Sequence, residues 1–302
     1  MRMKGTSVAS ILFAFVVSTA RAADWTHFRG PDRSGISKEE KAPLEWSPTE
    51  NIKWKAPLPS AGNSSPVVSG GKVFVTCAEN KQGTRRSLYC FNRADGKQLW
   101  VKTVNYDKPD PTHGTNPYCA ASPAADGKRI IAWHGSAGLH CYDYDGKLLW
   151  SRDLGVIRHI WGWAGSPVIH GDAVYLNVGP GVRQFVCAID KSSGEVLWQT
   201  DEAGGAEDKS RETGDWIGSW STPVVTTVDG REQVLVFMAQ RVNAYEPKSG
   251  QKIWWVDGAG DLAYTDVLLA DHPEGEGKVG VAMAGYAGKA IGFKLGGEGD
   301  MT

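Results

Sequence analysis

The 302-residue chain carries 33 basic and 34 acidic residues, a formal net charge of −1, with no run of either sign. This balance gives no electrostatic support for a nucleic-acid partner or for attachment to anionic lipid. Its 37 glycines and 13 tryptophans are typical of short strands that are joined by tight turns and packed by bulky side chains.

The first 22 residues predict a cleaved secretory signal. Arg2 and Lys4 precede the apolar run 8–17, and Ala20 and Ala22 supply the small residues that a signal peptidase reads. The run is too short to span a bilayer, and no later stretch is long and apolar enough to do so. We therefore expect residues 23–302 to form one domain that is periplasmic or secreted and does not span a membrane.

A hairpin unit recurs along the chain, in which a small residue opens one strand, a Gly marks the turn and a Trp closes the next strand. Four copies occupy residues 90–100, 141–150, 188–198 and 244–254, and a partial copy at 51–54 retains only the closing strand. The closing tryptophans are Trp54, Trp100, Trp150, Trp198 and Trp254, which lie 46, 50, 48 and 56 residues apart. Gly96, Gly146, Gly194 and Gly250 are expected to take the positive φ of the turn.

A second unit, Ser/Thr-Pro followed by two small or apolar residues, lies between the hairpins at 65–68, 122–125, 166–169 and 222–225. A β-branched strand follows each copy after a turn, at 72–76, 129–132, 173–176 and 233–237. Four strands in about 50 residues without helical periodicity predict a propeller blade. The predicted fold is thus an all-β β-propeller of four-stranded antiparallel blades, with each Trp wedged against the neighbouring blade.

The C-terminal region predicts part of a further blade. Residues 279–283 and 290–294 match its second and third strands, and 296–300 its turn, but no Trp strand follows before Thr302. At roughly 48 residues per blade, the chain suffices for about five to six blades. We expect the domain to be truncated, that is, incomplete at its C-terminus.

The hairpins resemble the tryptophan-docking repeat of the quinoprotein, or PQQ-like, β-propellers, and Ala188, Asp190, Gly194 and Trp198 match that pattern best. Residues 25–35, 115–123 and 218–223 look like segments of the exported PQQ-like repeat proteins of planctomycete-type bacteria. Such proteins are similar to the propeller of the outer membrane protein assembly factor. The resemblance implies a ring of seven to eight blades.

The resemblance implies one possible enzymatic activity, that of a quinone-dependent dehydrogenase. Quinone-dependent dehydrogenases of this fold hold the quinone against an adjacent cysteine pair, whereas Cys77, Cys90, Cys119, Cys141 and Cys187 are all separated, and no Cys-x-x-Cys-His haem motif is present. We therefore expect no cofactor. PQQ with calcium belongs only to the alternative reading, a quinone-dependent alcohol or sugar dehydrogenase.

The cysteines and histidines favour structural roles. Cys90 and Cys141 occupy the repeat position of Ala188 and Ala244, which indicates core packing, although a cross-strand disulfide between Cys77 and Cys90 is an alternative. The seven histidines show no ligand spacing, so no metal site is predicted. No serine has the context of an activated nucleophile, and no catalytic residue is assigned.

The segments that precede the innermost strands are rich in aromatic and polar side chains, and in a propeller they surround one mouth of the central channel. The candidate ligand-binding residues are His113, Asn116, Tyr118, His159, Trp161, Trp163, Asp215, Trp216, Trp220 and Tyr264. They would suit a flat or aromatic ligand, a sugar or a peptide strand, and the alternative is that they only cap the blades. The leading hypothesis is a monomeric, non-catalytic scaffold that binds a protein or a cell-envelope component.

Overall fold

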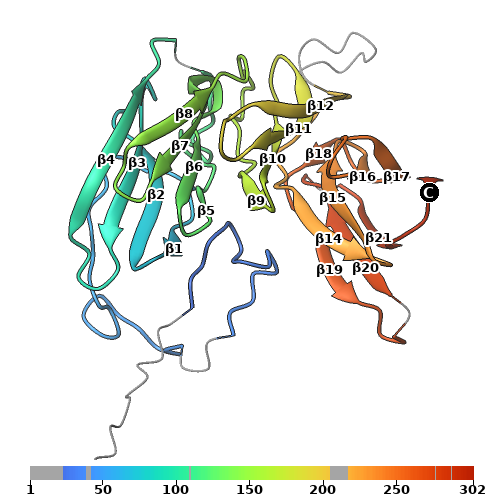
Figure 1. Cartoon of the computed structure of the whole chain (residues 1–302), viewed down its shortest axis with the longest axis horizontal. Helices are drawn as coiled ribbons and strands as arrows, with labels where there is room; N and C mark the ends of the chain where they lie inside the picture. Colours follow the sequence, from blue (N-terminus) through green and yellow to red (C-terminus); the bar gives the residue numbers. More distant parts are fainter. Residues whose placement is uncertain (1–22, 39–41, 109, 205–216, 276, 287) are drawn as a thin grey trace, which may run out of the picture.

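A computed structural model describes residues 23–38, 42–108, 110–204, 217–275, 277–286 and 288–302. Within these ranges the chain forms five successive antiparallel sheets, four of which contain a meander of four strands. In Figure 1 the first two sheets lie at the left, the third in the middle, and the last two at the right. The predicted all-β propeller of four-stranded blades is confirmed.

Strand order within each blade follows the chain. Blade 1 contains β1 (Val67–Ser69), β2 (Lys72–Ala78), β3 (Arg85–Asn92) and β4 (Gln98–Asn105). Blade 2 contains β5 (Ala124–Ala125), β6 (Arg129–Trp133), β7 (Leu139–Asp143) and β8 (Leu148–Arg152), with the short 3-10 helix η1 (Gly135–Ala137) between β6 and β7. Blade 3 contains β9 (Val168–His170), β10 (Ala173–Val178), β11 (Gln184–Asp190) and β12 (Val196–Glu202).

Blade 4 contains β14 (Val224–Val228), β15 (Arg231–Met238), β16 (Arg241–Tyr245) and β17 (Lys252–Asp257), and blade 5 contains β19 (Leu268–Asp271), β20 (Lys278–Met283) and β21 (Ala290–Lys294). Outside the blade meanders, β13 (Gly218–Ser219) pairs in parallel with β18 (Leu262–Ala263). Residues 296–300 do not form the predicted turn of blade 5. Instead, β22 (Gly299–Asp300) pairs in parallel with β17 and adds a fifth strand to blade 4.

Tryptophans lock neighbouring repeats together. The indole Nε1 of each of the first four repeat tryptophans donates a hydrogen bond to a backbone oxygen in the hairpin turn of the next blade. The pairs are Trp54 with Arg93 (2.9 Å), Trp100 with Tyr144 (3.1 Å), Trp150 with Lys191 (3.0 Å) and Trp198 with Pro247 (2.8 Å). The glycine of each turn provides the space, since a Cβ on Gly194 would lie 2.6 Å from the Trp150 ring.

The fifth repeat tryptophan packs differently. Trp254 donates to Oε1 of Gln233 (2.8 Å) within its own blade, and its ring contacts Phe293 of blade 5 at 5.9 Å between centroids. The Trp254 indole therefore bonds to a side chain and not to a backbone oxygen in the hairpin turn of the next blade. The sequence pattern therefore predicts the position of Trp254 in its strand but not its contact.

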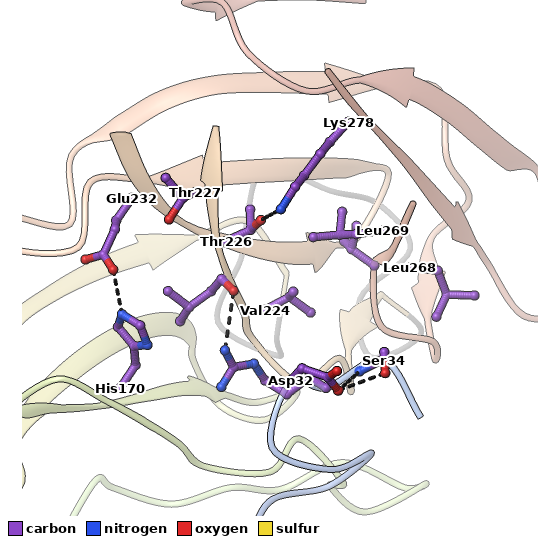
Figure 2. Close-up of a pocket in the computed structure, with 13 residues that line it drawn as sticks. Asp32, Ser34, His170, Val224, Thr226, Thr227, Glu232, Leu268, Leu269 and Lys278 are labelled. Atoms are coloured by element: carbon purple, nitrogen blue, oxygen red, sulfur yellow. Dashed lines mark hydrogen bonds and ion pairs between the residues drawn. The ribbon is translucent and has the colours of Figure 1, made fainter. Parts of the chain in front are cut away.

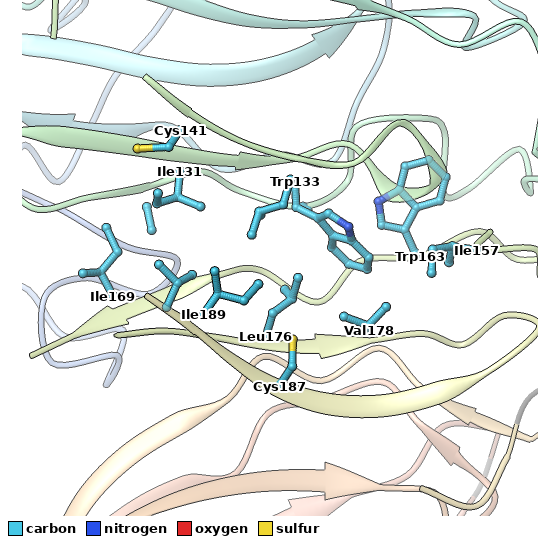
Figure 3. Packing of buried hydrophobic residues seen from close by; sticks show 14 of the residues in the cluster. Ile131, Trp133, Cys141, Ile157, Trp163, Ile169, Leu176, Val178, Cys187 and Ile189 are labelled. Carbon is cyan, nitrogen blue, oxygen red and sulfur yellow. The ribbon is translucent and has the colours of Figure 1, made fainter. Parts of the chain in front are cut away.

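The hydrophobic core lies between neighbouring sheets. Figure 3 shows one cluster, in which Ile131 and Trp133 of β6 face Leu176 and Val178 of β10 and Ile189 of β11. All five cysteines are buried and free, so the alternative of a disulfide between Cys77 and Cys90 is wrong. In the β2–β3 register, those two residues pair with Ser87 and Phe74 and not with each other.

The Ser/Thr-Pro units form a chain of hydrogen bonds from blade to blade. The backbone N–H of Ser65 donates to Oγ of Ser122 (2.8 Å), and that of Ser122 to Oγ of Ser166 (3.0 Å). The series continues from Ser166 to Oγ1 of Thr222 (3.2 Å) and from Thr222 to Oδ1 of Asp266 (2.6 Å). The hydroxyls of Ser122, Ser166 and Thr222 and the carboxylate of Asp266 thus fix the start of one innermost strand relative to that of the previous blade.

An N-terminal strap, residues 24–35, crosses four blades along the same innermost strands, and Figure 1 shows it as the dark blue trace between the left-hand and right-hand sheets. Its contacts are Trp25 with Val68, Thr26 O with Ala125 N, His27 Nε2 with Ile169 N and Arg33 Nη2 with Val225 O. Burial lowers the pKa of His27 to about 4, so its ring is neutral and accepts this hydrogen bond. The strap therefore joins blades 1 to 4 at the last residue of each Ser/Thr-Pro unit, three residues beyond the Ser or Thr that opens the unit.

Candidate ligand-binding site

A pocket of about 390 Å³ lies at the mouth formed by the segments that precede the innermost strands. Its size is within the range of about 300–1,000 Å³ that is typical of small-molecule sites. It is lined by Asn63, His113, Thr115, Asn116, Trp161, Ala164, Trp220, Tyr264 and Tyr286. These residues come from the segments before β1, β5, β9, β14 and β19 and from the β20–β21 turn, so all five blades contribute.

Hydrogen bonds hold the loop that carries Trp161. The Asn116 Nδ2 donates to the backbone oxygen of Trp161 (2.6 Å), and the Trp220 Nε1 donates to that of Gly162 (2.9 Å). Gly162 has φ +68°, and a Cβ there would lie 2.9 Å from the Thr112 hydroxyl. The blade 2 and blade 3 segments can approach this closely only because residue 162 is a glycine.

The parallel pair β13–β18 brings blades 4 and 5 together at the mouth. It is extended by a hydrogen bond from Trp220 N to Ala263 O (2.9 Å), which places the Trp220 ring against Tyr264 with centroids 4.8 Å apart and planes at 67°. Gly285 lies beneath the Tyr264 ring, which a Cβ at that position would overlap. Backbone pairing and one glycine therefore fix two of the aromatic rings.

Trp161 is the centre of the aromatic wall. Its ring centroid lies 6.1 Å from Trp220, 6.3 Å from Tyr264 and 5.8 Å from Tyr286, and it is nearly parallel to the Tyr286 ring at 26°. Exposure increases outward from Trp220 (5%) through Tyr264 (37%) to Tyr286 (77%). The wall is thus anchored in the protein at one side and presents ring faces to solvent at the other.

The segments before β1 and β5 form a polar wall of the pocket, and no lining residue carries a carboxylate or an ammonium group. Nδ1 of His113 shares a hydrogen bond with Oγ1 of Thr115 (2.8 Å), and Nδ2 of Asn63 donates to the Thr115 backbone oxygen (3.0 Å). Burial and the neighbouring Tyr286 raise the pKa of Tyr264 to about 12, so its hydroxyl stays protonated and neutral. The pocket offers neutral donors and acceptors beside aromatic faces.

The structure brings five of the ten candidate residues into this pocket: His113, Asn116, Trp161, Trp220 and Tyr264. His159 is buried beneath it, against the rings of Trp161 (5.5 Å) and Trp220 (5.0 Å). Asp215 and Trp216 lie outside the described residues.

Tyr118 and Trp163 do not line the pocket, since both are buried around the guanidinium of Arg86, at 5.2 and 4.7 Å from its centre. The Tyr118 hydroxyl also donates to the backbone oxygen of Asp110 (2.6 Å). Their rings therefore serve packing among blades 1, 2 and 3, which is the capping alternative considered from the sequence.

Four lining residues were not among the candidates. Asn63 precedes the first Ser/Thr-Pro unit, and Thr115 and Ala164 lie in or beside segments that the sequence had indicated, so the same rule identifies them. Tyr286 lies between the second and third strands of blade 5, away from any Ser/Thr-Pro unit, and no repeat signal marks it.

A second cavity, of about 370 Å³, lies between the strap and blades 3 to 5. Figure 2 shows that its polar groups bond to one another: His170 Nε2 contacts Glu232 Oε1 at 2.8 Å, and Lys278 Nζ contacts Thr226 Oγ1 at 3.2 Å. Throughout the described ranges, no group of three metal-ligating side chains is found, and no helix has the length and apolarity needed to cross a membrane.

Comparison with known proteins identifies the family. The family model described as outer membrane protein assembly factor BamB matches residues 44–117 and 84–259, whereas no curated protein sequence matches. Among solved structures, quinohemoprotein alcohol dehydrogenase from Comamonas testosteroni is 16% identical with a TM-score of 0.61, and the alignment covers 92% of this chain and 50% of that one.

A europium-containing methanol dehydrogenase is 15% identical with a TM-score of 0.56, over 75% of this chain and 48% of that one. BamB from Moraxella catarrhalis is 16% identical over 83% of this chain and 69% of that one, with a TM-score of 0.49. The chain spans about half the length of the two dehydrogenases, and identities this low show the fold alone. The family match over residues 44–259, together with the repeated docking tryptophans, shows that this chain belongs to the BamB family of PQQ-like repeat β-propellers.

Proposed function

We propose that this chain is an exported, monomeric, non-catalytic propeller that binds a protein or a cell-envelope component at the channel mouth. The observation that carries the proposal is the aromatic pocket, to which all five blades contribute and whose outermost ring, Tyr286, is 77% exposed. Exposed aromatic groups beside satisfied polar groups are typical of recognition surfaces. Membership in a family named for outer membrane protein assembly supports an envelope setting, in which residues 1–22 serve as the export signal and 23–302 as the propeller domain.

Asp266 and Cys119, two potentially reactive side chains near the mouth, have structural roles. Asp266 is buried, and its Oδ1 accepts the hydrogen bond from Thr222 N. Cys119 lies 4.0 Å from Nδ1 of His134, but both are fully buried, and burial raises the pKa of the Cys119 thiol to about 12. A protonated, inaccessible thiol is not a nucleophile, which supports binding over catalysis.

The alternative is a PQQ-dependent alcohol or sugar dehydrogenase, which the neighbouring rings of Trp161 and Trp220 and the fold shared with such enzymes favour. PQQ carries three carboxylates and is bound with calcium. The described pocket lining contains neither an Arg or Lys to neutralise a carboxylate nor an acidic side chain to hold calcium. These residues do not fit the cofactor, so we propose no bound quinone.

Two measurements on the purified full-length protein test the proposal. Addition of PQQ and calcium should give neither a stoichiometric chromophore nor dye-linked alcohol oxidation. Co-sedimentation with cell-envelope fragments of a Gram-negative bacterium should occur and should be weakened by Tyr286→Ala. A bound, catalytically active quinone, or sedimentation that Tyr286→Ala leaves unchanged, would overturn the proposal.

A further inference from the structure

We infer that the ligand of the mouth pocket is an uncharged saccharide, an inference that rests on the proposed binding function. A pyranose ring has apolar faces made of C–H groups and a rim of hydroxyls. It therefore needs an aromatic surface beside neutral hydrogen-bonding groups. The lining of the pocket contains both features.

The aromatic wall supplies the stacking surface. Trp161 and Tyr286 lie with planes at 26° and centroids 5.8 Å apart, and Tyr264 closes the corner at 6.3 Å from each of them. These spacings are contacts between rings, so the cluster is a packed platform and not an open cage around a cation. The electron-rich faces of such a platform attract the weakly positive C–H groups of a sugar.

The polar wall supplies hydrogen bonds of the kind that sugar hydroxyls use. Asn63 and His113 are exposed side chains at the rim, and their described hydrogen bonds use Nδ2 of Asn63 and Nδ1 of His113. These hydrogen bonds do not use the Asn63 Oδ1 or the His113 Nε2, which we propose as an acceptor and a ring nitrogen for the ligand. The Tyr264 hydroxyl, which stays protonated, adds a donor.

Charge and backbone pairing favour a neutral sugar over the other ligand classes. No acidic or basic side chain apart from His113 lines the pocket, so a phosphate, a uronic acid or a cationic peptide finds no partner among the described lining residues. A peptide added as a strand would need free backbone groups, but the N–H groups of Gly218 and Trp220 already bond to Asp261 O (3.2 Å) and Ala263 O (2.9 Å). Recognition at this mouth therefore depends on side chains.

Isothermal titration calorimetry of the full-length protein tests this inference with three neutral probes, maltohexaose, cellohexaose and chitohexaose, and one charged probe, hexagalacturonate. At least one neutral hexasaccharide should bind, and hexagalacturonate should bind at least tenfold more weakly. Tyr286→Ala should weaken neutral binding by about tenfold or more, as truncation of an aromatic anchor does. Trp46→Ala is the matched control, since Trp46 is 68% exposed and lies outside the pocket.

Absence of binding by all three neutral probes would overturn the saccharide inference, as would equal binding of hexagalacturonate. So would a Tyr286→Ala variant that binds like the wild type, or pocket-dependent binding of a decaproline peptide in place of the sugars. Failure of the proposed function is distinguishable, because it appears as envelope sedimentation that does not depend on Tyr286. If sedimentation depends on Tyr286 but no sugar binds, only the saccharide inference fails.

Discussion

Replacing Arg86 with methionine tests the packing between blades 1 and 2. Arg86 of β3 is fully buried, and its Nη2 lies 2.8 Å from Oδ2 of Asp110. Its Nε donates to Gly83 O (2.7 Å) and its Nη1 to the His134 carbonyl in blade 2, while Asp110 Oδ1 accepts a hydrogen bond from Ser136 (2.8 Å). Arg86→Met keeps the length of the side chain but leaves a buried carboxylate with one hydroxyl partner.

The expected cost follows from that geometry. Breaking a buried, hydrogen-bonded ion pair by removing one partner destabilises a protein by about 3–5 kcal/mol, because the remaining charge is uncompensated. In the Arg86→Met background, Asp110→Asn should recover about 1–3 kcal/mol, since the amide removes the charge and still accepts the Ser136 hydrogen bond. The double variant should therefore be more stable than the single variant.

Urea unfolding followed by tryptophan fluorescence measures both effects from the midpoint and the slope. A loss below about 1 kcal/mol for Arg86→Met would refute the reasoning, because a group that costs so little to remove cannot be neutralising a buried charge. A double variant less stable than Arg86→Met would refute it as well.

Two further substitutions test the mouth. Gly285→Ala should displace the Tyr264 ring and weaken envelope binding in co-sedimentation. Gly292→Ala is the control, because its Cβ would meet nothing within 4 Å and binding should be unchanged. Equal binding by the two variants would contradict the position of the Tyr264 ring. Burial raises the pKa of Asp266 from 3.8 to about 6, so the folded state favours the protonated carboxyl. The resulting stabilisation, about 3 kcal/mol, is fully present below pH 4 and is lost as the pH rises through 6. Asp266→Asn keeps an acceptor for the Thr222 N–H and should flatten the melting temperature between pH 4 and 6; parallel wild-type and variant curves would contradict this assignment.

The fold could be predicted because one packing contact between blades repeats along the chain. A large indole packs on a glycine turn of the next blade, so Gly and Trp must recur at the spacing of a blade, and that spacing is visible in the sequence. Trp254 keeps the spacing, but its indole bonds to Gln233 of its own blade and its ring contacts Phe293 of blade 5, and neither partner belongs to the repeated hairpin. The parallel pairing of β22 with β17 likewise joins segments that share no pattern.

The candidate site was predictable in part for the same reason. Residues before the innermost strands gather at one mouth in any propeller, which identifies Trp161, Trp220 and Tyr264. Whether a ring faces the mouth or the core depends on neighbours that are distant in sequence. Trp163, for example, is buried against the Arg86 guanidinium. Tyr286 reaches the mouth from the turn between the second and third strands of blade 5, and only the three-dimensional structure shows this.

Hydroxyl-radical footprinting of the full-length protein, with and without cell-envelope fragments, tests most directly whether the ligand meets the protein at the aromatic pocket. Tyr286 and Trp46 are 77% and 68% exposed, so both should be oxidised readily in the free protein. The account predicts that the fragments protect Tyr286 and leave Trp46 unchanged. Protection of Trp46 with continued oxidation of Tyr286 would contradict it.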